Sequence, residues 1–229
     1  MSDDHGNDLL GERERQLDTA ASSELAALAV ADAASRVLAD LIQRAPVPPR
    51  ATAPTAEELG HQAIWFMAVT AFRAARAAMW VSRVGYEDQA VAYVRLIDEL
   101  HNRAQKVRED TSGNYAREWL AGRSLGKGSK LAGQELWELL SGPVHANARA
   151  VLDWLAISHD DGSTKVVLGP ERRPEVANGT LVYIAGELRD IAAMLSAAAG
   201  MPLDGLALLT AEIQGAQREH WGPDADAVT

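Results

Sequence analysis

The chain has 229 residues, of which 47% are hydrophobic and 24% are charged, and its formal net charge at pH 7 is −10. This length and apolar content are sufficient for one domain with a sizeable buried core. The sequence contains no cysteine, which excludes disulfides, thiolate zinc sites and cysteine nucleophiles. The negative charge opposes extensive contact with a nucleic-acid backbone.

The N-terminal part is predicted to begin with a disordered segment, residues 1–11, which is acidic and lacks the pattern of a secretory signal. Apolar residues then recur at helical spacing over 12–45, which predicts one long helix. The segment PVPPRATAP ends this helix, because proline cannot continue it. The helix is rich in alanine, so it is a candidate for oligomer contacts, although it can equally pack within its own chain.

Two long helices are expected next, over about 56–84 and 86–110. Thr55 and Glu58 form a capping-box pattern at the start of the first, and Gly85 suits a C-terminal cap. The connection is so short that the two helices should be antiparallel. The most apolar window, HQAIWFMAVTAFRAARAAMWV, contains Arg73 and Arg76 and is interpreted as a core helix of a cytoplasmic protein rather than a membrane span.

The second half of the chain is more interrupted. Further helices are expected over about 114–121, 130–140, 143–158, 174–199 and 203–219, and one short extended segment lies near 164–168. The predicted fold is therefore all-α, a bundle of about six or seven helices. It forms a single helical domain over 12–221, followed by a flexible tail, 222–229.

Two apparent ligand motifs are rejected on spacing. The loop at 122–129 differs from a phosphate-binding P-loop in its glycine spacing and lacks the Ser/Thr that reaches the metal. The pairs Glu58/His61 and Asp98/His101 resemble carboxylate–histidine ligands of di-metal bundles. On antiparallel helices they would lie roughly 16 Å apart along the axis. No metal and no cofactor are therefore expected.

Arg95 and His101 match the loose Arg-x(4–6)-His pattern of HEPN-type ribonucleases, in which a histidine base works with an arginine that stabilises phosphate charge. On one continuous helix these two side chains would lie about 120° apart. The alternative interpretation is a half-buried His101 and a surface ion pair between Arg95 and Glu99.

The segment WELLSGPVHAN contains Trp137, Ser141, His145 and Asn147 around a helix junction interrupted by proline. Helix junctions expose backbone N–H groups that can bind anions, so these residues are candidate binding residues. Alternatively, Trp137 belongs to the core and His145 hydrogen-bonds to nearby carbonyl groups.

Aromatic and basic residues could also bind nucleic acid. The six tryptophans are mostly at spacings that favour the core over base stacking. A local basic patch that could contact RNA consists of Arg117, Arg123, Lys127 and Lys130.

Read together, the helix with Arg95 and Glu99, the junction with His145 and the extended run from Val166 to Pro170 resemble a bacterial family. That family consists of helical proteins of unknown function and is distantly similar to HEPN-like domains. The resemblance implies that Arg95, Glu99 and His145 gather inside the bundle. It also implies a setting in phage defence, toxin or RNA-processing systems. The chain differs from the HEPN pattern in having Leu96 after the arginine.

Two functional hypotheses follow. The first is a non-catalytic interaction or regulatory protein that self-associates or binds a protein partner, in bacterial defence or stress response. The second is a metal-independent ribonuclease, with His145 or His101 as the base and Arg95 stabilising the phosphorane.

Overall fold

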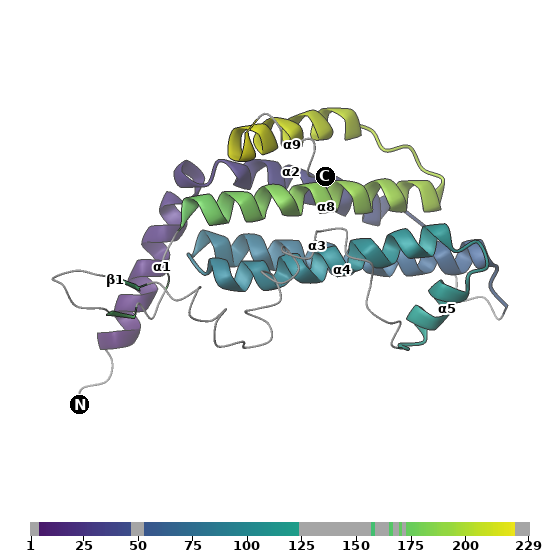
Figure 1. Cartoon of the computed structure of the whole chain (residues 1–229), viewed down its shortest axis with the longest axis horizontal. Coiled ribbons are helices and arrows are strands. Elements are labelled where there is room, and N and C mark those ends of the chain that lie inside the picture. The colour runs from purple at the N-terminus through teal and green to yellow at the C-terminus, as the bar shows by residue number, and fades with distance from the viewer. Residues whose placement is uncertain are drawn as a thin grey trace.

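A computed structural model describes residues 5–46, 53–123, 157–158, 165–166, 170 and 173–222. Within these residues it contains seven helices and one pair of very short strands. The prediction of an all-α bundle is therefore confirmed. Four long helices, α2, α3, α4 and α8, form the body of the bundle, and α9 packs over α8 and α2 (Figure 1).

The first expected helix is in fact two helices, α1 (His5–Glu24) and α2 (Ala27–Arg44). Helix α1 also begins within the segment expected to be disordered. The break depends on a side chain from another helix, because Asn178 accepts a hydrogen bond from the Ala27 N–H at 3.0 Å. The same side chain donates to the Glu24 carbonyl at 3.4 Å. Asn178 thus caps both sides of the break, which allows α1 and α2 to diverge (Figure 1).

Helices α3 (Ala56–Arg83) and α4 (Glu87–Glu109) form the expected antiparallel hairpin. Thr55 accepts from the Glu58 N–H at 3.1 Å, and Glu58 accepts from the Thr55 N–H at 2.7 Å, so the capping box is present. Gly85 has a φ of 86°, which permits the tight turn. A Cβ placed on Gly60 would lie 3.7 Å from Val107, so the start of α3 lies beside the end of α4, as an antiparallel hairpin requires.

The remaining described helices are α5 (Asn114–Leu120), α8 (Pro174–Ala199) and α9 (Leu206–Trp221). Helix α8 packs against α2, α3 and α4, so it is the central helix of the bundle. Its buried face contributes large aliphatic side chains, whereas α3 contributes a row of alanines that lets neighbouring backbones approach closely. The fully buried aliphatic residues of α8 include Leu181, Ile184, Leu188, Ile191 and Leu195.

Two details of the second half differ from expectation or extend it. Strand β1 (Ile157–Ser158) pairs antiparallel with β2 (Lys165–Val166), and Ile157 is opposite Val166. The helix expected to continue to residue 158 therefore does not include Ile157. The predicted extended segment near 164–168 is confirmed by β2, although it pairs with a second strand instead of standing alone.

Among the described helices, α3 is long and apolar enough to cross a membrane by length and composition. A core helix of a soluble protein meets the same criteria, and α3 packs against α2, α4 and α8.

Candidate functional site

A cluster of polar side chains is buried between α4 and α8. Asp98 and His101 come from α4, and Tyr183 and Glu187 come from α8. The Tyr183 hydroxyl donates to Asp98 Oδ1 at 3.0 Å, and His101 Nδ1 lies 2.7 Å from Glu187 Oε2. We call these four residues the α4–α8 polar cluster.

Helical spacing on both elements creates this arrangement. Asp98 and His101 are three residues apart, and Tyr183 and Glu187 are four apart, so each pair shares one face of its helix. These faces are otherwise apolar and turn toward the core. The polar side chains on them are therefore buried as well. Asp98 is only 2% exposed, and His101 and Glu187 are each 9% exposed.

Burial and neighbouring charge change the protonation of the cluster. Burial, together with the charge of the nearby Glu187 carboxylate, raises the pKa of Asp98 to about 6. Burial opposes a charged imidazole at His101, but the hydrogen bond and charge of Glu187 outweigh it and raise the His101 pKa. Burial and the carboxylates of Glu187 and Asp98 also raise the pKa of Tyr183. The cluster thus retains protons that isolated side chains would release.

The chemistry available to the cluster is proton sharing in a poorly hydrated space. A histidine and two carboxylates in a low-dielectric site hold a proton across a wider pH range than they would in water. No group of three or more His, Cys, Asp or Glu side chains able to hold a metal occurs among the residues that the structure describes.

Of the predicted catalytic residues, the structure describes Arg95, Glu99 and His101. Arg95 Nε contacts Glu99 Oε1 at 3.3 Å, as the i,i+4 spacing suggested. The Arg95 side chain is 13% exposed and that of Glu99 is 36% exposed, so the pair is partly buried where the sequence suggested a surface pair. On continuous α4, Arg95 and His101 point about 120° apart. His101 faces Glu187, and it is buried rather than half-buried.

The other predicted residues divide into two groups. Trp137, Ser141, His145 and Asn147 lie outside the described residues, as do Lys127 and Lys130. Within the described part of the proposed basic patch, Arg117 donates to Asn114 at 2.6 Å and Arg123 contacts both carboxylate oxygens of Glu118 at 2.9 Å.

Sequence reasoning did not single out Tyr183 and Glu187. Their signal is weak but present, since a tyrosine and a glutamate at i,i+4 interrupt the mostly apolar run of α8. The sequence alone does not show that this pair faces Asp98 and His101, which are about 85 residues away. Only the packing of α4 on α8 brings them together.

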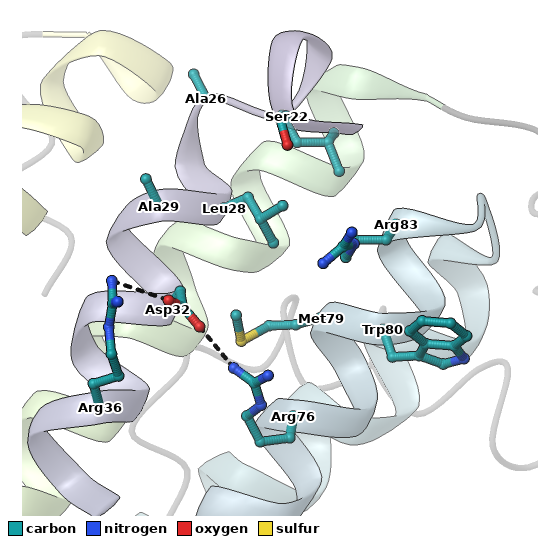
Figure 2. A pocket seen from close by; sticks show the side chains of 11 residues that line it. Ser22, Ala26, Leu28, Ala29, Asp32, Arg36, Arg76, Met79, Trp80 and Arg83 are labelled. Carbon is teal, nitrogen blue, oxygen red and sulfur yellow. Dashed lines mark hydrogen bonds and ion pairs between the residues drawn. The ribbon is translucent and has the colours of Figure 1, made fainter. Parts of the chain in front are cut away.

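A second feature is an open pocket between the α1–α2 break and the C-terminal half of α3, with a volume of about 380 Å³ (Figure 2). Asp32 lies between two arginines there, with Arg76 at 2.7 Å and Arg36 at 3.0 Å. Trp80 is 59% exposed at the edge of the pocket and is an exception to the expected core placement, whereas Trp65 and Trp119 pack against the core. Trp221, at 46% exposed, is a second exception among the described tryptophans.

The chain matches no protein-family model, and searches of curated proteins and solved structures also find no match. Its fold is an all-α helical bundle. It carries a buried acid–histidine–tyrosine cluster and a separate pocket lined by arginine.

Proposed function

We propose that this chain is a non-catalytic helical interaction or regulatory protein of the cytoplasm, which acts by self-association or by binding a partner. The resemblance of its motifs to a bacterial helical family that is distantly similar to HEPN-like domains is the ground for placing it in bacterial defence or stress response. One observation carries the proposal. Within the described residues, the two side chains best suited to ribonuclease chemistry, Arg95 and His101, each contact a carboxylate and are largely covered.

The covered histidine argues against general-base catalysis. A base must reach the hydroxyl from which it takes a proton, directly or through one water. His101 Nδ1 already faces Glu187, and the residue is 9% exposed. An RNA strand therefore has little access to this imidazole.

The arginine supports the same interpretation. Stabilising a phosphorane requires donors directed at the place where charge develops. Arg95 directs Nε at Glu99, and its side chain is 13% exposed. It would have to leave this carboxylate and reach solvent before it could contact a phosphate.

A cleavage assay tests the proposal. Labelled single-stranded RNA is incubated in chelator with the full chain and with Arg95→Ala, His101→Ala and His145→Ala, all purified identically. We expect the four proteins to give the same background. Cleavage by the unmodified chain that Arg95→Ala, His101→Ala or His145→Ala abolishes would overturn the proposal in favour of a metal-independent ribonuclease. Arg44→Ala is the matched control, because Arg44 is an exposed arginine paired at i,i+4 with Asp40.

A further inference from the structure

The pocket between α2 and α3 combines an apolar wall with a cationic edge. Leu28 from α2 and Met79 from α3 extend toward each other across it (Figure 2). Leu25, which is 1% exposed, and Met79, which is 5% exposed, close its inner side. The accessible apolar surface of the pocket therefore comes from half-buried Leu28 and from exposed Ala26 and Ala29, with Leu25 and Met79 packed behind it.

Three guanidinium groups, those of Arg36, Arg76 and Arg83, lie along the same pocket, where Asp32 is the acidic residue in the lining. Asp32 forms an ion pair with Arg76 through Oδ1 and with Arg36 through Oδ2, so one carboxylate pairs with two arginines. Arg83 pairs with Asp18 of α1 at 2.8 Å. Even with both aspartates counted, the group keeps a formal charge of +1 in a chain whose net charge is −10.

These arginines can accept an additional anion. A guanidinium has five N–H donors, and a single carboxylate oxygen occupies only part of them. The side chains of Arg36 and Arg76 are 74% and 51% exposed, so their remaining donors are reachable from solvent. The Trp80 ring is directed away from Leu28 (Figure 2).

We propose that this pocket binds a small amphipathic organic anion. Its apolar body would lie against Leu28 and the exposed alanines beside it, Ala26 and Ala29, and its carboxylate, sulfonate or phosphate head would contact Arg36 and Arg76. The pocket volume of about 380 Å³ lies in the range of small-molecule sites. The inference deepens the proposed function, on which it rests, by naming a ligand class through which a non-catalytic helical protein is regulated.

The test compares two fluorescent probes with the same ring system. Anilinonaphthalene sulfonate carries an anionic head, whereas phenylnaphthylamine is its neutral counterpart. Both are titrated into the full chain at physiological salt. We expect the sulfonate to bind at a single site, and Arg36→Gln and Arg76→Gln each to weaken that binding about tenfold. Binding of the neutral probe should be weaker and should not respond to either arginine substitution.

Arg44→Gln is the matched control. Arg36 and Arg44 lie on the same helix, each pairs with an aspartate four residues earlier, and both are exposed. Arg44 is two turns further along, roughly 12 Å, which exceeds the screening length at physiological salt. Arg44→Gln removes the same charge and should change affinity less than about twofold. Leu28→Gln should weaken both probes, and circular dichroism verifies the fold of each variant.

Failure to bind the sulfonate, or equal losses from Arg36→Gln and Arg44→Gln, would overturn the ligand assignment. Equal binding of the neutral and anionic probes would also overturn it. None of these outcomes bears on whether the chain cleaves RNA. Conversely, specific RNA cleavage would refute the proposed function and leave the probe result as it stands, so the two failures are distinguishable.

Discussion

His101 Nδ1 lies 2.7 Å from Glu187 Oε2, and this contact joins α4 to α8 inside the bundle. The Glu187 carboxylate is the main reason that the pKa of His101 is raised despite burial. Its negative charge also raises the pKa of Asp98. Burial is the larger cause at Asp98, and the Glu187 charge adds to it, so this carboxylate favours the protonated form of two groups on α4.

Glu187→Gln removes this charge and keeps the shape of the side chain. We expect the pKa of His101 to fall, because burial then opposes the imidazolium with less compensation. A titration of the imidazole resonances by NMR measures this. Glu212→Gln, at an exposed position of α9, is the matched control and should leave the His101 titration unchanged. An unchanged His101 titration would contradict the role assigned to Glu187.

Asp98→Asn tests the linkage between protonation and stability. Asp98 has its pKa raised from 3.8 to about 6, so the native state keeps a proton that the unfolded chain releases between about pH 4 and pH 6. The stability contributed by this group is therefore lost as pH rises through that interval. The His101 pKa is also raised, so its contribution is likewise present at low pH and lost as pH rises through the folded-state value.

The aspartate thus costs stability above about pH 6, by an amount on the order of 3 kcal/mol at 1.36 kcal/mol per pKa unit. Asparagine can still accept from Tyr183, so Asp98→Asn should stabilise the protein at about pH 8 and change it little at about pH 4. Urea unfolding at both pH values measures the difference. Asp204→Asn, at an exposed loop position, is the matched control for removal of one carboxylate from the surface and should change stability by less than about 0.5 kcal/mol. A stability difference that is the same at both pH values would contradict the shifted carboxyl.

Thr55→Ala tests the cap of α3. The substitution removes the acceptor for the Glu58 N–H and should destabilise the protein by about 1 kcal/mol. Thr70→Ala is the matched control in the same helix, because the Thr70 hydroxyl donates to the Phe66 carbonyl within the helix. Loss of this hydroxyl should leave the free energy of unfolding almost unchanged. Equal destabilisation by the two substitutions, measured by urea unfolding, would show that the capping box contributes little.

Gly113→Ala tests the junction between α5 and the start of α3. Gly113 has a φ of 70°, and a Cβ there would lie 2.7 Å from the Ala56 Cα. Gly205 has a similar φ of 80°, but a Cβ at Gly205 would have no described atom within 4 Å, so Gly205→Ala introduces backbone strain alone. We expect about 1 kcal/mol of destabilisation at Gly205 and roughly 2 to 4 kcal/mol at Gly113, where a steric clash is added. Thermal unfolding of both variants gives the difference, and equal losses would exclude the close contact with α3.

Several local features were predictable because their causes lie within a few residues. Proline at the first turn and glycine beyond the last turn set the observed limits of α8, Pro174–Ala199. Thr55 and Glu58 set the start of α3, and the short turn at Gly85 made α3 and α4 antiparallel. The ion pair of Arg95 with Glu99 also follows from i,i+4 spacing.

The sequence by itself therefore determined the all-α class, the limits of the best-capped helices and the face that each turns inward. Tertiary structure decided which faces meet. The break between α1 and α2 has no local signal, because its cap is Asn178, about 150 residues away. The pairing of His101 with Glu187 likewise spans 86 residues. A helical period identifies a buried face, but only the packing of helix against helix selects its partner.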